Sequence, residues 1–511
     1  MNVLERSLAV VAPRLALNRM QYRMAMRHLE SQEQRQRQGR ERRYDAASKG
    51  RRASKWRNDA TSANAETAAA STIRNRARDL ERNNAYAAKA LTSIVSNVIG
   101  TGIQAQVKGG KGAKRRADKA HALWVSWAET TACDWDGAHD LYGLQALVMR
   151  TVVRDGEALV RFRWENDGEF PLKLQVLEAD FLDSTKQSGE NGNDVIQGVE
   201  VDSNGRVVAY WLHSHHPGDG LFGWFRRKLH GSQRVPADQV ARIFRRERAG
   251  QLRGVSWFAP IMAPLRDLDE YEDAQLTRQK IASCFTVFVT DPNADEAEAG
   301  GDEDENGTPL EKVEPGIIEY LGPGKDVRFP NPPSVEGFGD FVRAVLRKVA
   351  SGIGLTYETL TGDLTQTNFS GGRMSWIEQG RNIESWQWQL IIPQLCVPVA
   401  RQFKRGADIV GLDMAGLEVD WTAPRRELIN PKEEIAAMVA EVRAGFKSWS
   451  EVLRERGYDP ATVMAQIAAD AELFDKYGLI FDSDPRRTTQ QGQPRDKALP
   501  SKGADASASA A

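Results

Sequence analysis

Residues 260–285 are predicted to form a long helix that has almost no apolar face. Pro260 and Pro264 stand at its start, and its middle, DLDEYEDAQLTRQK, has no continuous apolar stripe. A helix that is polar nearly all round is usually held by partners or by its own ion pairs. The fold must therefore place this helix against something other than an ordinary hydrophobic core.

The segment before this helix, residues 61–255, has the pattern of an α+β domain. Helices are expected over residues 72–98, 117–130 and 141–155, where apolar residues keep helical spacing. The strings ALVRFRWE and LKLQVLEA alternate and predict strands. Asn204-Gly205, between two apolar runs, is a strong short-range signal for a hairpin.

The segment after the polar helix begins with an acidic insertion. Residues 295–305, DEAEAGGDEDE, carry seven carboxylates and no base. A second helix is expected over 338–353, with a basic face formed by Arg343, Arg347 and Lys348. A Gly/Thr/Asn loop then leads to a helix over 374–404, predicted to be interrupted near Pro393.

The C-terminal part is predicted to be helical. Asn430-Pro431, with Glu433 at the third helical position, and Ser448, with Glu451, are typical of capped helix starts. Another start is expected at Asp459-Pro460, and the glycines expected to end the last two helices are Gly457 and Gly478. Beyond Ser483 the chain is polar and is predicted to be disordered.

Charge is segregated along the chain. The net charge of −1 combines an Arg-rich arm over the first sixty residues with the acidic insertion, which indicates placed surfaces rather than general nucleic-acid affinity. No apolar run is long enough to predict a membrane span, and no secretory signal is expected. Cys133, Cys284 and Cys396 lie far apart and are expected to be reduced thiols.

The search for catalytic motifs favours a structural interpretation each time. The chain has no phosphate-binding P-loop motif, and Gly218, Gly220 and Gly223 match a dinucleotide pattern in a setting that favours a surface turn. A solvated loop is expected to hold the nearby His213, His215 and His216. No pair of Cys or His residues that could complete a metal site with them is close in sequence.

Two further groups of residues each allow two interpretations. Asp134, Asp136 and Asp140 are either a divalent-metal cluster or, as we favour, a turn with an N-cap at Asp140. The tryptophans Trp376, Trp386 and Trp388, near Arg373 and Arg381, are interpreted as packing residues rather than as base-stacking ones. No catalytic, cofactor-binding or metal-binding residue is predicted.

Seven strings occur in an order that resembles the lambda-like family of phage portal proteins. They are RARDLERNNAYAAKALTSIVSNVIGTGI, CDWDGAHDLYGLQALVMRTVVRDGEALVRF, LQVLEADFLD, GVEVDSNGRVVAYWLH with HPGD, RVPADQVARIFRRERAGQLRGVSWFAPIMAPLRDLDEYEDA, LTGDLTQTNFSGGRMSWIEQGR and DWTAPRRELINPKEE. The resemblance covers roughly residues 70–480. It implies a non-enzymatic virion protein with an α+β portal fold, in which paired stem helices join a wing to a small α/β clip.

The resemblance also implies a plan for the whole chain. The parts are a basic arm (1–60), a wing (61–255), a first stem helix (256–286), a clip with the acidic insertion (287–335), a second stem helix (336–355), a tunnel loop (356–373), a wing-return helix (374–428), a helical crown (429–482) and a disordered tail (483–511).

In such a plan the tunnel loop lines a DNA channel. Asp363, Thr365, Gln366 and Asn368 are the candidate channel residues, and the basic face of the second stem helix is a further candidate site. The implied assembly is a ring of usually twelve copies at one capsid vertex, put together in the host cytoplasm. The implied partners are terminase, head–tail joining proteins, capsid or scaffold proteins and double-stranded DNA, with no cofactor and no membrane.

Two other classes of function remain open from the sequence. One is another virion structural or head–tail adaptor protein. The other is a metal-dependent enzyme acting on DNA, with the metal held by the cluster over residues 134–140.

Overall fold

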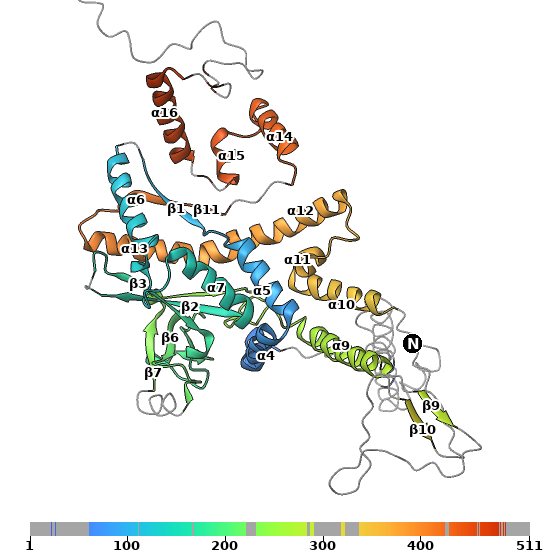
Figure 1. Cartoon of the computed structure of the whole chain (residues 1–511). Coiled ribbons are helices and arrows are strands. Elements are labelled where there is room, and N and C mark those ends of the chain that lie inside the picture. Colours follow the sequence, from blue (N-terminus) through green and yellow to red (C-terminus); the bar gives the residue numbers. More distant parts are fainter. Residues whose placement is uncertain are drawn as a thin grey trace, which may run out of the picture. The chain divides into compact units, whose positions relative to one another are not determined.

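The structure is a computed structural model (Figure 1). It describes residues 61–110, 112–165, 168–220, 231–283, 287–290, 318–321, 337–424, 429–456 and 460–479, together with Tyr22, Met26, Tyr458, Phe481, Asp484 and Arg486. The predictions for the basic arm, the acidic insertion, Gly223, Cys284, Gly457, Asp459 and the C-terminal tail lie outside these residues, apart from the few that are named.

The first predicted helix, over 72–98, is two helices. After the short α3 (Ala63–Glu66), α4 spans Ala70–Asn83 and α5 spans Ala85–Val98, and Asn84 between them is extended, with φ −118° and ψ 118°. The Asn84 side chain accepts a hydrogen bond from the Ala87 N–H (2.9 Å) and so caps α5. Periodicity alone missed this break, because both helices carry apolar residues in nearly the same phase.

The next two helices match their predictions. Helix α6 spans Lys114–Ala128, and α7 spans Leu141–Asp155. Asp140 caps α7 by accepting a hydrogen bond from Gly143 N–H (2.7 Å), and Gly156 ends it in the left-handed region, with φ 94°.

Two antiparallel sheets follow in the wing. The first has the order β3–β2–β8, in which β2 spans Glu157–Trp164, β3 spans Leu172–Glu178 and β8 spans Val240–Phe244. The second has the order β4–β5–β6–β7 and comprises β4 (Asp194–Ile196), β5 (Val199–Val201), β6 (Val207–His213) and β7 (Ser232–Pro236). The predicted hairpin is confirmed, because β5 pairs with β6 and Gly205 has φ 75°.

Strand β2 differs from the simple alternation predicted for it. Its first four residues are all buried, because its two faces belong to different cores. Ala158 and Val160 pack into the large core with α7, and Leu159 packs into a smaller core with Leu177 and Val240. The sequence is apolar on both faces for this reason.

The wing also contains a strand pair that the sequence did not indicate. Strand β1 (Gln104–Gly109) pairs antiparallel with β11 (Leu417–Thr422), which lies about 310 positions further along the chain. Short strands whose partner is so distant give a weak local signal. The predicted wing-return segment, 374–428, is therefore not wholly helical.

The long helical segment before β11 is continuous. Helix α12 (Phe369–Trp386) passes into a π-helical stretch (Gln387–Cys396) and then into α13 (Val397–Ile409). The interruption predicted near Pro393 takes the form of this π-helical stretch, whose wider turns accommodate a residue that cannot donate a backbone hydrogen bond. Phe403 of α13 packs on Trp124 of α6, with ring centroids 4.8 Å apart.

The helices expected over 260–285 and 338–353 are present as α9 (Met262–Ser283) and α10 (Phe338–Ile353) (Figure 1). They contact each other through Tyr271, whose ring lies 4.6 Å from that of Phe341. Two short strands, β9 (Val287–Thr290) and β10 (Ile318–Leu321), pair in parallel.

Three helices follow β11, at the predicted places: α14 (Pro431–Arg443), α15 (Trp449–Glu455) and α16 (Pro460–Tyr477). Ser448 caps α15 at Glu451 N–H (3.1 Å), and Gly478 follows α16 with φ 66°. The capping predicted for α14 is wrong in detail. Glu434, not Glu433, accepts from the Asn430 N–H, and the Asn430 side chain makes no capping bond.

Within the described ranges, every helix is too short or too polar to cross a lipid bilayer. Cys133 and Cys396 are buried free thiols, as expected, and burial raises the pKa of Cys133 to about 12.

Candidate functional site

The loop between α10 and α12 is shorter than predicted. Helix α10 ends at Gly354 (φ 81°), and a short helix, α11 (Tyr357–Thr361), occupies the first part of the expected loop. Asn368 then caps α12 by accepting a hydrogen bond from Gly371 N–H (2.7 Å). Gly371 and Gly372 are therefore helical, and the irregular loop covers residues 362–368.

Asp363 organises this loop. One carboxylate oxygen accepts hydrogen bonds from the Thr365 N–H (3.0 Å) and hydroxyl (2.6 Å), and the other accepts from the Tyr357 hydroxyl (3.0 Å). These bonds, led by those from Thr365, hold the pKa of Asp363 below its usual range. The carboxylate is thus ionised at neutral pH and fixes the loop from within.

The basic face of α10 lies partly beside this carboxylate. The Arg347 guanidinium is 5.6 Å from the centroid of the Tyr357 ring, and the charge of Arg343 contributes to the lowered pKa of Asp363. Arg343 also lies 3.7 Å from Asp340. Lys348 is exposed. The structure therefore brings Arg343 near the loop residue Asp363 and Arg347 onto the ring of Tyr357, which hydrogen-bonds that carboxylate.

The remaining loop side chains face outward. Thr365, Gln366 and Asn368 are exposed. Between Lys348 and Arg373 the sequence has no cation, and its charged residues are Glu358 and Asp363. The exposed polar side chains of the loop are accordingly uncharged.

Sequence reasoning missed an apolar surface beside the loop. Leu364 is 66% exposed and Phe369 is 62% exposed. With Trp376 and Ile429 they line an open groove of about 400 Å³. The string LTQTNF contained the signal, since two large apolar residues stand in an otherwise polar loop. Of the other tryptophans in this helix, Trp386 packs on Trp257 at 4.9 Å, and Trp388 is half exposed.

The cluster at residues 134–140 has a structural role. The buried Asp134 carboxylate accepts hydrogen bonds from the N–H groups of Asp136, Ala138 and His139, at 3.2, 2.9 and 3.0 Å. Asp140 caps α7. Both carboxylates thus stabilise a turn and a helix start, as we favoured, and the arrangement offers no support for a metal-dependent enzyme.

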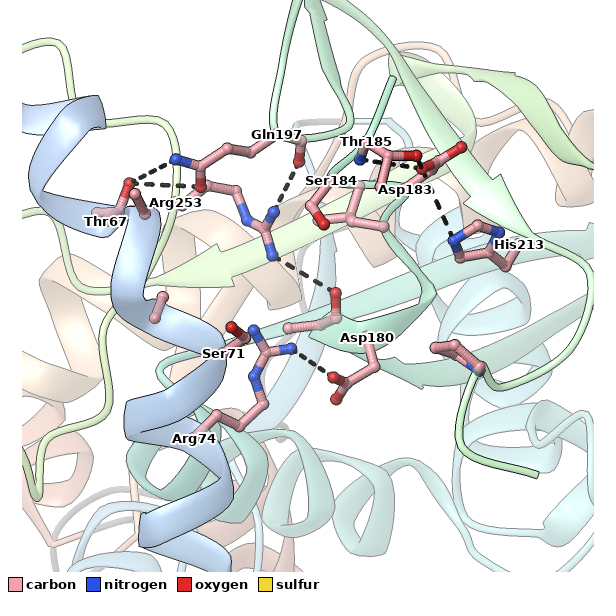
Figure 2. Close-up of a pocket in the computed structure, with 15 residues that line it drawn as sticks. Thr67, Ser71, Arg74, Asp180, Asp183, Ser184, Thr185, Gln197, His213 and Arg253 are labelled. Carbon is pink, nitrogen blue, oxygen red and sulfur yellow. Dashed lines mark hydrogen bonds and ion pairs between the residues drawn. The ribbon is translucent and has the colours of Figure 1, made fainter. Parts of the chain in front are cut away.

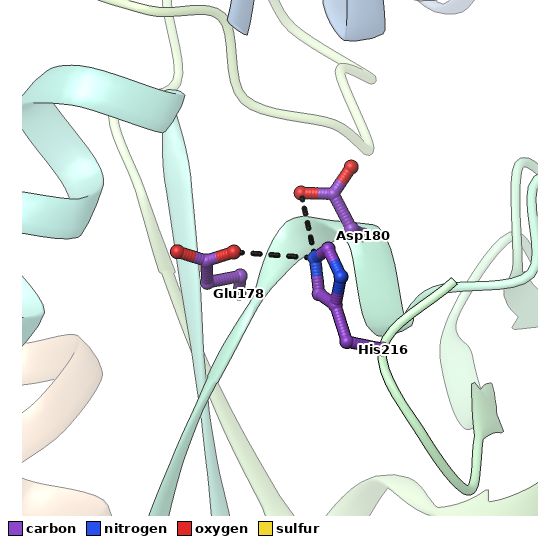
Figure 3. Close-up of side chains that lie close together, drawn as sticks. All are labelled: Glu178, Asp180 and His216. Carbon is purple, nitrogen blue, oxygen red and sulfur yellow. Dashed lines mark ion pairs between the residues drawn. The ribbon is translucent and has the colours of Figure 1, made fainter. Parts of the chain in front are cut away.

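The prediction of a solvated histidine loop is wrong for His216. Its Nε2 atom lies 3.3 Å from Glu178 and 3.8 Å from Asp180, and all three side chains are partly buried (Figure 3). These three residues form a group with the spacing of metal ligands. Both carboxylates already bind the Arg78 guanidinium, at 2.9 and 2.7 Å. A bound guanidinium supplies the positive charge that a metal would otherwise bring.

Arg78 is the centre of a larger ion-pair network in the wing. It also pairs with the fully buried carboxylate of Asp155 at 2.8 Å. Burial alone would raise the pKa of Asp180, but Arg74 and Arg78 outweigh it and hold that pKa below its usual range. No local pattern indicated this network, because its members come from α4, α7, β3 and the short turn after β3.

A polar pocket of about 550 Å³ adjoins the network (Figure 2). Arg74 enters it from α4 and pairs with Asp180 at 3.0 Å, and Arg253 borders it while paired with the buried Glu157. His213 lies 3.9 Å from Asp183 on another side. Cations and carboxylates balance one another across the pocket, and its lining offers no activated nucleophile.

Comparisons with known proteins give one consistent result. The family model described as phage portal protein, lambda family, matches residues 49–387. A probable portal protein of Halomonas phage phiHAP-1 is 29% identical over 429 residues, which covers 80% of this chain and 81% of that protein. Portal protein B of Escherichia phage lambda is 21% identical over 480 residues, covering 81% and 88%.

Solved structures are similar at a lower level. A chain from the neck of a native gene transfer agent particle, computed with C12 symmetry, has a TM-score of 0.40 and 14% identity, covering 75% of this chain and 94% of its own. A chain from the neck of the empty particle, computed with C6 symmetry, has a TM-score of 0.41 and 13% identity, with 75% and 94% covered.

Proposed function

The chain belongs to the lambda family of phage portal proteins, and from this premise we infer which of its residues serve that role. It is a structural subunit of the portal vertex of a virion, not an enzyme. Copies of such a subunit form a homo-oligomeric ring, which is the channel for DNA packaging and ejection and a docking site for other proteins.

We propose the finer points of this role from the family resemblance. The ring has twelve copies and assembles in the host cytoplasm. It docks terminase during packaging and head–tail joining proteins afterwards, and capsid or scaffold proteins surround it. The wing is residues 61–255, α9 and α10 are the stem, β9 and β10 belong to the clip, and α14, α15 and α16 form the crown.

We further propose that the loop over residues 362–368 faces the DNA. The observation that carries this proposal is the exposed, uncharged polar surface formed by Thr365, Gln366 and Asn368. Duplex DNA presents one negative charge for about every 1.7 Å of its axis, so cations on a channel loop would bind phosphates at each step. An uncharged loop held from within by Asp363 contacts the duplex without fixing its register.

A pair of lysines in this loop tests the proposal. Rings carrying Thr365→Lys with Gln366→Lys are expected to assemble but to package DNA slowly or stall, most severely at low salt. Packaging is measured as the protection of DNA from nuclease in a reconstituted reaction, over a range of salt concentrations.

The matched control is Thr365→Met with Gln366→Met, which removes the same hydrogen bond to Asp363 and has similar length but no charge. It is expected to package nearly as well as the wild type. Normal packaging by the lysine rings contradicts contact between this loop and DNA, and an equal loss in both variants shows that loop structure rather than charge is responsible.

A further inference from the structure

The exposed side of α9 is strongly acidic. Residues 266–273 contain five carboxylates and one cation, Arg266. The one ion pair on this stretch joins Arg266 to Glu270 at 2.8 Å among the described residues, and both side chains are largely exposed. Asp267 and Asp273 are exposed and have no ion-pair partner in the described part of the chain. Asp267, Glu270 and Asp273 are called the acidic face of α9 below.

The crowding of like charges is visible inside this stretch as well. Burial, together with the negative charges of Asp269 and Asp273, raises the pKa of Glu272 above its usual value. The subunit supplies a hydrogen bond to Asp269 from Asn84 (2.8 Å). A nearby cation would relieve the remaining repulsion.

Helix α10 carries cations that also lack carboxylate partners. Arg343 lies near Asp340, but Arg347 contacts the ring of Tyr357, and Lys348 is exposed with no ion pair within the described ranges. No described ion pair joins α9 to α10 within the subunit. Arg347 and Lys348 are called the basic face of α10.

The two faces lie at about the same level along the helix pair. At one end, Ile261, which directly precedes α9, packs closely against Gly352 of α10. A Cβ atom added to that glycine would lie 2.7 Å from the isoleucine side chain. At the other end Tyr271 stacks on Phe338, with ring centroids 5.7 Å apart. The helices are thus antiparallel neighbours (Figure 1), and Arg347 and Lys348 lie near the level of Asp267.

We propose that the acidic face of α9 in one copy binds the basic face of α10 in the next copy around the ring. The proposal rests on the ring described under the proposed function. A closed ring of identical subunits uses two different surfaces of each copy. Rotation about the ring axis leaves height along that axis unchanged, so with the helix pair running along the axis, faces that share a level in one subunit meet at that level between neighbours.

The charges of the two faces fit a second copy of the chain better than they fit DNA. A duplex would be repelled by the acidic face and would be held by the cations of every copy at each step of passage. A second copy places charges of opposite sign against both faces at once. The first turns of α9 bury Leu265 and Leu268 in the large core, and a neighbouring copy would complete the polar remainder of the helix, which has no apolar stripe.

Each such ion pair is weak by itself, because water and salt screen exposed charges. Their effect lies in selection of the correct neighbour, since like charges placed against each other are strongly unfavourable. The repetition of the same contact at every subunit boundary makes the assembly sensitive to a reversal of charge.

Charge reversal tests the proposal with two variants of the full chain. One carries Asp267→Lys and Asp273→Lys, and the other carries Arg347→Glu and Lys348→Glu. Each variant alone places like charges at every boundary, so the association constant for ring formation is expected to fall at least about tenfold near 0.1 M salt. Sedimentation velocity measures the fraction in rings, and higher salt is expected to restore part of it.

The decisive measurement is an equal mixture of the two variants. Alternating copies match opposite charges at every boundary, so the mixture is expected to recover rings that contain both variants. Native mass spectrometry reads the composition of those rings. The chain with all four substitutions is expected to assemble alone. If the two faces instead pair within one subunit, the fourfold variant will form rings but the mixture will not. That result would overturn the proposal.

Controls separate this result from folding and from the ring itself. Asp118→Lys with Glu418→Lys changes the net charge by the same amount as the Asp267→Lys, Asp273→Lys variant, on exposed positions away from α9 and α10, and is expected to assemble normally. If the wild type forms no ring, the proposed function fails first. If wild-type rings form and both reversal variants also assemble normally, the ring stands and this interface is wrong. If both reversal variants assemble normally but only the Arg347→Glu, Lys348→Glu variant fails to package DNA, the basic face binds DNA instead.

Discussion

The wing and the helices from α9 to α12 differ in where their charged side chains find partners. In the wing, buried charges are paired inside the subunit: Arg253 with Glu157, Arg78 with Asp155, and Arg234 with Glu200. In α9 and α10, by contrast, four charged residues are exposed and have no ion-pair partner among the described residues: Asp267, Asp273, Arg347 and Lys348. The wing segment satisfies its buried charges within its own chain, whereas we propose that α9 and α10 are completed by a neighbouring copy.

The same contrast holds for apolar side chains. The wing encloses Trp124, Trp127 and Phe403 almost completely, whereas the region around the 362–368 loop leaves Leu364 and Phe369 largely exposed. Substitutions that disturb the subunit's own fold and substitutions that disturb the ring are therefore expected to fall in different places.

The largest effect on stability is expected from Arg253→Met. This change leaves the buried Glu157 carboxylate, which is about 1% exposed, without its cation. The free energy of unfolding is expected to fall by about 3–5 kcal/mol, the usual cost of breaking a buried pair by removal of one partner. Chemical denaturation followed by circular dichroism measures it.

Arg266→Met is the matched control on the stem side. It breaks an exposed pair with Glu270, and unfolding of the subunit is expected to stay unchanged. Equal losses in the two variants would remove the distinction between a self-completed wing and a stem completed by neighbours.

A smaller effect is expected from Asn84→Ala. Asn84 is buried, caps α5 at Ala87 and bonds Asp269 of α9. Loss of a cap of this kind costs about 1 kcal/mol. The neighbouring Asn83→Ala is the control, since Asn83 is exposed and bonds Asp79 within its own helix. The two unfolding curves should differ, and identical curves would mean that the cap contributes nothing.

The smallest effect is the dependence of wing stability on acid through Asp180. Its folded pKa is lowered below the ordinary 3.8, despite burial, by Arg74 and Arg78. A lowered carboxyl pKa contributes stability that is present above the unfolded value and is lost as pH falls through the folded value. Wild-type stability should therefore fall below about pH 4.

Asp180→Asn isolates this effect. The variant should be less stable near neutral pH, and its free energy of unfolding should fall less steeply than that of the wild type as the medium is acidified. Parallel curves for the two proteins below pH 4 would show that Asp180 is not linked to folding in the way its arginine partners indicate.

The sequence by itself determined those elements whose signals are local. Helix α7 follows from Asp140 and Gly156, the β5–β6 hairpin follows from Asn204-Gly205, and the bounds of α10 agree with the predicted 338–353. Caps, turns and helical periodicity act within a few residues of each other, so they are readable without the fold. The order of seven strings also pointed to the portal family, which the family model confirmed.

Tertiary structure alone decided what depends on distant segments. It paired β1 with β11, divided the two faces of β2 between two cores, and joined Arg78 to carboxylates from α7 and β3. It also set Arg343 near Asp363 and Arg347 over the ring of Tyr357. These contacts form when chain segments far apart in sequence pack together, and that packing is a property of the whole fold rather than of any local pattern.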